Sequence, residues 1–137
     1  MAYTIASKNK KQKMKILVLD DDQAMLDVIA KKLQDKNYEV ITRTDPIKAL
    51  GVIYSHSIDL IISDILMPGV SGYALMNLLK QFHCKIPIIL ISSLDEKEVI
   101  MATRDLETAA IISKPVKFQE LFLKLEKIKH ANRFVKD

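Results

Sequence analysis

Residues 58–72, IDLIISDILMPGVSG, are the stretch that decides which fold we expect for this chain. The run LIIS over residues 60–63 is apolar or small, and Met67-Pro68-Gly69 interrupts any regular structure soon after it. A short apolar run that ends at turn residues is typical of a buried strand in a parallel sheet. Asp64 then stands at the carboxyl end of the strand, where open α/β sheets gather their ligand sites. Its carboxylate is either a structural cap or a chemical group.

Outward from this strand, the chain alternates apolar strand patterns with helical ones. The other strands are expected over 15–19, 38–42, 87–91 and 109–112, and the helices over about 22–36, 45–54, 72–82, 95–104 and 117–132. Such alternation predicts parallel strands joined by right-handed crossovers, with helices on both faces of the sheet. We therefore expect one α/β domain, a doubly wound three-layer sandwich.

Several helix ends carry recognisable signals. Asp22 precedes the first helical pattern and is placed to cap it, while Asn37 is suited to end it. Asp45-Pro46 combines a capping acid with a proline in the first turn of the second helix.

Composition bounds the class of protein. The 137 residues are 49% hydrophobic and 28% charged, which fits one globular domain. No apolar run reaches membrane-spanning length and no signal peptide opens the chain. The single cysteine, Cys84, fits a reducing compartment, so we expect a cytoplasmic protein.

The net charge of +4 is unevenly distributed. Residues 1–15 contain five lysines and no acid, and residues 114–137 carry seven basic and three acidic side chains. We expect a flexible basic lead over residues 1–13, a folded domain over 14–133 and a short tail over 134–137. A basic lead can contact nucleic acid or lipid headgroups, but most such runs are solvated tails.

Polar side chains follow four of the expected strands. They are Asp20 and Asp21 after the first strand, Asp64 after the third, Ser92 after the fourth and Lys114 after the fifth. Parallel strands end at one edge of a sheet, so these groups converge. Clustered carboxylates repel unless a cation intervenes, and Mg²⁺ takes carboxylate oxygens together with water and phosphate. The set is what phosphoryl transfer to a carboxylate requires: an Asp nucleophile, with a metal and a lysine to neutralise charge.

Together these residues give the chain a specific likeness. It resembles bacterial response-regulator receiver domains over about residues 14–131, through the acid pair in ILVLDDD, the motif DILMPGVSG at 64–72, the hydroxyl in ILISS and the Lys-Pro after the fifth strand. The resemblance implies a flavodoxin-like sheet in the order 2-1-3-4-5. It also implies a stand-alone signalling module that catalyses only its own phosphorylation and dephosphorylation, rather than an enzyme acting on other substrates.

The resemblance also implies residue roles. Asp64 is the phosphoacceptor. The protein ligands of Mg²⁺ (or Mn²⁺) are Asp64, Asp21, the backbone carbonyl of Leu66 and, through a water molecule, Asp20.

Two further roles concern the phosphoryl group. Lys114 holds it, with a cis peptide bond to Pro115. Ser92 follows it on activation and draws its loop inward.

Signalling partners follow from the same resemblance. A sensor histidine kinase or phosphotransfer protein donates the phosphoryl group. Output passes through protein contacts of the fourth helix, fifth strand and fifth helix, to a target that the sequence does not identify. We expect a monomer or weak dimer, without a DNA-binding domain.

One position departs from the family pattern. Ile111, three residues before Lys114, replaces the usual Tyr or Phe, so the aromatic rotamer switch is missing. A phosphorylation-independent scaffold on the same fold is therefore an alternative. An aspartyl-phosphate hydrolase is a weaker one, because those enzymes place the nucleophile after the first strand, followed by a second Asp two residues on and a Thr or Gly, where this chain has Gln23-Ala24.

Overall fold

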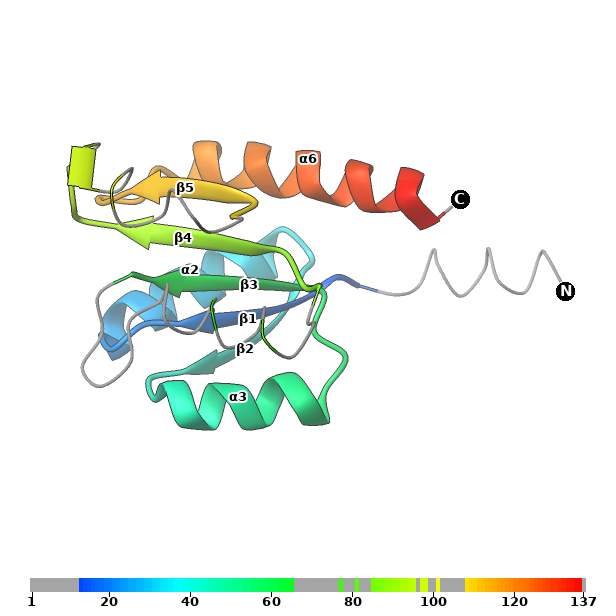
Figure 1. Ribbon diagram of the computed structural model, residues 1–137, viewed down its shortest axis with the longest axis horizontal. Helices are drawn as coiled ribbons and strands as arrows, with labels where there is room; N and C mark the ends of the chain where they lie inside the picture. The colour runs from blue at the N-terminus through cyan, green and yellow to red at the C-terminus, as the bar shows by residue number, and fades with distance from the viewer. Residues whose placement is uncertain are drawn as a thin grey trace, which may run out of the picture.

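The computed structural model describes residues 13–65, 77, 81, 85–95, 97–98, 101 and 108–136. Five strands form one sheet in the order β2-β1-β3-β4-β5, and every neighbouring pair is parallel (Figure 1). The strands are β1 (Lys15–Leu19), β2 (Glu39–Arg43), β3 (Leu60–Asp64), β4 (Ile88–Ser92) and β5 (Ala110–Ser113). The predicted number of strands, their direction and their order are confirmed.

Helices cover both faces of the sheet. The structure contains α2 (Gln23–Asp35), α3 (Pro46–Ser55) and α6 (Phe118–Lys136). Side chains of α2 and α6 share one buried cluster with the sheet, and side chains of α3 belong to the cluster on the other face. The helices expected over 72–82 and 95–104 lie largely outside the described residues.

β3 is the central strand, and its sequence reflects that position. All five residues from Leu60 to Asp64 are buried. Leu60 and Ile62 pack with the α2 and α6 side, whereas Ile61 packs with the α3 side. Because both faces are covered, the strand is continuously apolar instead of alternating with polar residues. This confirms the interpretation of residues 60–63 as a buried strand.

The capping predictions are confirmed in detail. The Asp22 carboxylate accepts hydrogen bonds from the N–H groups of Ala24 and Met25, at 3.0 and 3.3 Å. Asp45 accepts from the N–H of Ile47 at 2.9 Å, and Pro46 follows it. At the other end of α2, Asn37 has a φ of 72°, a left-handed conformation that Asn adopts more readily than most residues.

Three strands begin and end one residue later than predicted, with identifiable causes for two. Tyr38 donates its N–H to Leu33 O at 3.1 Å, closing α2, so β2 starts at Glu39. Pro87 has no N–H to give to the ladder, and β4 starts at Ile88. β5 likewise runs from Ala110 to Ser113, which pairs with Ser92.

The last helix is longer than predicted. α6 continues to Lys136 rather than ending near residue 132, because residues 133–136 contain neither glycine nor proline to stop it. Residues 134–136, which we expected to form a tail, therefore extend the helix.

Candidate functional site

The carboxyl edge of the sheet brings the predicted polar residues together. Asp64 is the last residue of β3, and Asp20 follows β1 directly. The Asp20 N–H donates to Arg43 O, at 3.3 Å, which continues the ladder between β1 and β2 by one bond. Asp20 and Asp64 are only 2% and 5% exposed. The fold therefore buries two carboxylates side by side at one edge.

A third carboxylate completes this cluster. Carboxylate oxygens of Asp20, Asp21 and Asp64 all lie within 4.8 Å of one another. Asp21 is exposed, so the cluster is open to solvent on its side. The Asp20 carboxylate also accepts a hydrogen bond from the N–H of Asp22 at 2.9 Å, which fixes its orientation.

Lys114 follows the outer strand β5, and its side chain extends to the carboxylate cluster. Its Nζ donates to Asp64 Oδ2 at 2.7 Å and lies 3.6 Å from Asp20 Oδ2. The Lys114 N–H donates to Ser92 O at 2.7 Å, and the Lys114–Pro115 peptide bond is cis, as predicted. The ammonium group thus contacts both buried carboxylates.

The charges of these groups alter their protonation. Burial raises the pKa of Asp20, and the Asp64 charge adds to this, although the Asp22 N–H and Lys114 oppose it. For Lys114, burial alone lowers the pKa, but the hydrogen bond and charge of Asp64, together with Asp20, raise it overall. The Asp20 carboxyl therefore keeps its proton to a higher pH than an exposed aspartate, because Lys114 only partly offsets the effect of burial on its pKa.

Ser92 lies at the same edge, at the end of β4, and is 1% exposed. Its hydroxyl oxygen accepts the N–H of Leu94 at 2.9 Å. The side chain is thus engaged with its own loop in this structure.

The donor set fits a divalent metal ion of the magnesium type. Three carboxylates within reach of one another supply hard oxygen ligands, and the exposed Asp21 leaves room for water. Asp20, Asp21 and Asp64 are the described residues that could hold the ion. The carbonyl of Leu66, also expected to bind it, lies outside the described residues.

The described side chains that sequence reasoning predicted for the site lie at one edge of the sheet, but it missed two backbone groups that orient Asp20. These are the Arg43 carbonyl and the Asp22 N–H. The Asp-x-Asp spacing was a visible signal for the second, since an Asp side chain commonly bonds the N–H two residues on. The first depends on how β1 pairs with β2.

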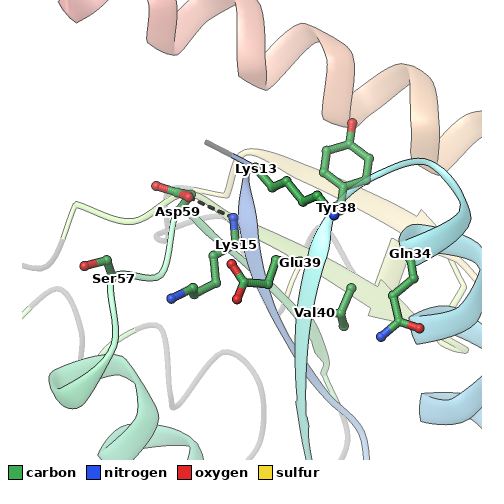
Figure 2. Close-up of a pocket in the computed structure, with 8 residues that line it drawn as sticks. All are labelled: Lys13, Lys15, Gln34, Tyr38, Glu39, Val40, Ser57 and Asp59. Atoms are coloured by element: carbon green, nitrogen blue, oxygen red, sulfur yellow. Dashed lines mark hydrogen bonds between the residues drawn. The ribbon is translucent and has the colours of Figure 1, made fainter. Parts of the chain in front are cut away.

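A hollow lies at the opposite edge of the sheet, where the strands begin, and none of the predicted site residues line it. It has a volume of about 820 Å³ and is lined by Lys13, Lys15, Gln34, Tyr38, Glu39, Val40, Ser57 and Asp59 (Figure 2). Asp59 accepts the backbone N–H of Lys15 at 2.8 Å, the contact that is dashed in Figure 2.

Comparison with known proteins agrees with this geometry. Residues 16–126 match the family model of the response regulator receiver domain. The receiver domain of the Francisella response regulator 1452 superposes with a TM-score of 0.82 at 25% identity, covering 88% of this chain and 99% of that one.

Two curated relatives are whole regulators. The chain is 32% identical over 112 residues to the nisin biosynthesis regulatory protein NisR of Lactococcus lactis, covering 82% of this chain and 48% of that protein. It is 28% identical over 115 residues to the heme response regulator HssR of Staphylococcus saprophyticus, covering 82% and 50%. The chain therefore spans half or less of the length of these regulators.

Proposed function

The chain belongs to the response regulator receiver domains of two-component systems, and from that premise we propose that Asp64 is its phosphoacceptor. The observation that carries the proposal is the contact of 2.7 Å between Lys114 Nζ and Asp64 Oδ2, inside a cluster of three carboxylates. Receiver domains are signalling modules rather than enzymes of the usual kind, so the reaction we propose is the chain's own phosphorylation and later hydrolysis.

Asp64 acts as the nucleophile. A carboxylate oxygen attacks the phosphorus of the donor, forming an O–P bond as the bond from phosphorus to the donor's leaving group breaks. For a phosphohistidine donor that bond is N–P, and its electrons return to the imidazole. Asp64 is 5% exposed, so only a donor that approaches along the open side of the cluster reaches it.

Lys114 stabilises the transferred group. Its ammonium already lies on Asp64 Oδ2 and near Asp20, so little rearrangement is needed for it to contact a phosphoryl oxygen attached to Asp64. A preorganised positive charge is the main contribution a protein can make to phosphoryl transfer.

Mg²⁺ (or Mn²⁺) bound at the carboxylate cluster supplies the remaining charge neutralisation. We assign Asp21 and Asp64 as direct ligands, the Leu66 carbonyl as a third, and Asp20 as a ligand through water. The like charges of Asp20 and Asp64 support this assignment, because one lysine leaves a cluster of three carboxylates with a net negative charge.

Ser92 couples the site to the rest of the molecule in this proposal. Its hydroxyl leaves the Leu94 N–H and donates to a phosphoryl oxygen, which displaces the loop that follows β4. That loop leads to the helix expected over 95–104, which with β5 and α6 forms the output surface that we propose.

Ile111 shapes how the signal crosses that surface. It is half-buried and packs against the core cluster on the α3 side. An aliphatic side chain held there has no hydroxyl to exchange between inward and outward positions. The proposed signal is therefore a displacement of the loop and helix, without an aromatic switch.

Partners and setting complete the proposal. A histidine kinase or phosphotransfer protein supplies the phosphoryl group in the cytoplasm, and a protein target reads the output surface. Among the described residues, no helix is long and apolar enough to cross a membrane.

Intact-mass spectrometry after incubation with acetyl phosphate tests the proposal. We expect a Mg²⁺-dependent phosphoryl adduct on the wild type and none on Asp64→Asn. Asp59→Asn is the matched control, because Asp59 precedes the same strand yet lies at the other edge, and it should retain the adduct. An adduct on Asp64→Asn would move the acceptor elsewhere, and no adduct on any form would favour the scaffold alternative.

A further inference from the structure

β2 is an edge strand, and part of its backbone faces away from the sheet. The order of the strands places it beside β1 alone. Glu39 donates its N–H to the residue that precedes β1, at 3.0 Å, and Arg43 O accepts the N–H of the residue that follows β1, at 3.3 Å. Backbone groups alternate in direction along a strand, so the N–H and C=O groups of Val40 and Thr42 point outward.

This outer edge is accessible to solvent. Residues 40–43 are half-buried and Glu39 is exposed, whereas every residue of the central strand β3 is buried. Glu39 and Val40 also line the hollow at the amino edge of the sheet, which therefore opens onto the start of β2 (Figure 2). In the described part of the chain, no residue bonds to the outward N–H or C=O of Val40. Unpaired backbone groups of this kind are a template on which another strand can pair.

The sequence of β2 favours such pairing. Val40, Ile41 and Thr42 are consecutive β-branched residues, a type that is enriched in strands. Charged residues flank them, with Glu39 on one side and Arg43 on the other. Proteins commonly place charges beside an apolar strand to prevent association from edge to edge. The edge therefore combines a segment that pairs readily with flanking residues that can oppose pairing.

Arg43 does more than carry a charge at the end of this strand. Its Nη1 donates to the Thr42 carbonyl at 2.7 Å, and that oxygen is one of the outward groups. The side chain thus folds back along its own strand instead of extending into solvent, which restricts its conformational freedom. The bond is short and its donor is charged, as in the stronger hydrogen bonds of proteins. We propose that Arg43 closes the outer edge of β2 against the addition of another strand.

The contact blocks the group that a new strand needs. A strand that pairs with β2 has to place an N–H on the Thr42 carbonyl, where the guanidinium group of Arg43 already donates. Pairing therefore displaces a hydrogen bond that is present in the monomer. In a solution of the pure protein, the strand that Arg43 excludes is β2 of another copy, because every molecule carries the same edge. This role is independent of phosphorylation at Asp64.

Sedimentation equilibrium of the full chain between about 10 µM and about 1 mM tests the proposal. We expect Arg43→Ala to associate about tenfold more strongly than the wild type, because strand addition no longer displaces a hydrogen bond from a charged donor. Lys48→Ala is the matched control. Lys48 is an exposed residue of α3, the helix that follows β2, and its loss changes the net charge equally. The control should associate no more strongly than the wild type.

Two results of this experiment would contradict the proposal. If Arg43→Ala and the wild type associate equally, the bond to the Thr42 carbonyl does not close the edge. If Lys48→Ala gains as much association as Arg43→Ala, the cause is the lower net charge and not the contact within β2.

Amide hydrogen exchange locates the new contact. The N–H groups of Val40 and Thr42 point outward in the monomer, whereas the same alternation directs the Ile41 N–H to β1. In Arg43→Ala at high concentration, the two outward groups should exchange about tenfold more slowly than in the wild type, with little change at Ile41. Slower exchange elsewhere, without a change at Val40 and Thr42, would show that the copies associate through a different surface and would refute the proposal.

A proline tests the same edge in the opposite direction. Thr42→Pro removes an outward N–H and no bond to β1, so a proline is acceptable at this position of an edge strand. Added to Arg43→Ala, it should return the association to the level of the wild type. Val40→Lys, which adds a charge to the edge, replaces the proline if thermal unfolding shows that the first double variant is not folded. A folded double variant that associates as strongly as Arg43→Ala would exclude β2 as the pairing strand.

Discussion

Asp59 and Asp64 lie at the two ends of the same strand and have different surroundings. Asp59 precedes β3 and accepts a single backbone N–H, that of Lys15, at the rim of an open hollow (Figure 2). Asp64 ends β3, is 5% exposed, and lies among two other carboxylates and an ammonium group. Asp59 makes a contact within the fold, whereas Asp64 belongs to a cluster of charged groups.

The difference follows from the direction of the strands. The residues that follow β1 and β5 supply acids and a lysine at the carboxyl edge, since parallel strands finish there together. At the amino edge, the strands start from helix ends and loops that supply mixed charges. Among the described residues, the three-carboxylate cluster occurs only at the carboxyl edge. Residue type alone does not distinguish Asp59 from Asp64. The groups that the fold places around each carboxylate do.

The largest effect that separates the two edges should come from Lys114. Lys114→Ala removes the charge that contacts Asp64 and should slow phosphorylation by acetyl phosphate about 100-fold, the usual cost of losing one preorganised stabilising group. Lys15→Ala, at the amino edge, should leave the rate unchanged. Adduct formation followed by intact mass over time measures both. An equal loss in the two variants would mean that the effect is general charge rather than the contact with Asp64.

A smaller effect is expected on metal binding. Asp21→Asn should weaken Mg²⁺ affinity about tenfold, or 1.4 kcal/mol, because one charged oxygen ligand is lost. The adjacent Asp22 caps α2, so Asp22→Asn should leave the affinity within error. Mg²⁺ titrations by calorimetry compare them. Similar losses in both would remove Asp21 from the ligand set.

The amino edge should show its role in stability instead. Asp59→Ala leaves the Lys15 N–H without its carboxylate and should lower the free energy of unfolding by about 1.5 kcal/mol, the value of a hydrogen bond to a charged group. Phosphorylation and Mg²⁺ affinity should not change. Urea denaturation measures the free energy of unfolding, and the intact-mass assay measures phosphorylation. An Asp59→Ala protein as stable as the wild type would show that this hydrogen bond is dispensable.

The smallest effect concerns pH and the charge trapped at the carboxyl edge. Burial raises the pKa of Asp20 above 3.8, so in the metal-free protein its contribution to stability is fully present below 3.8 and is lost as pH rises through the raised value. Asp20→Asn abolishes this loss and should stabilise the metal-free protein by about 1 kcal/mol near neutral pH, but not in acid.

Urea denaturation at about pH 7 and about pH 4, with and without Mg²⁺, measures this effect. Saturating Mg²⁺ should reverse the difference in the free energy of unfolding and make the wild type the more stable protein, because the ion is attracted to the charged carboxylate. A stabilisation that is the same at both pH values would show that the Asp20 charge is not its cause.

Much of this could be predicted because the signals are local. The run at 60–63 and the strands β1 and β4 on either side of it are apolar over the length of a buried strand. Asp22, Asn37 and Asp45 mark helix ends by their own side chains. The residues predicted for the site could be selected because each of them ends a strand or comes shortly after one. Strand boundaries were one residue off at Tyr38, whose N–H the sequence could not show to be committed to the end of α2.

Local sequence patterns were sufficient to predict the α/β fold, its parallel sheet, and which acids and which lysine lie at the strand ends. The contacts between those groups depend on the folded chain: Lys114 Nζ lies 2.7 Å from Asp64 Oδ2 and 3.6 Å from Asp20 Oδ2, and the Asp22 N–H orients Asp20. The tertiary structure also decided that Ile47 and Tyr54 face outward. The periodicity of a helix or strand involves residues that are close in sequence. The distances between the site side chains depend instead on how β1, β3 and β5 are aligned across the sheet. That alignment is a sum of packing over the whole core, which no single stretch of sequence records.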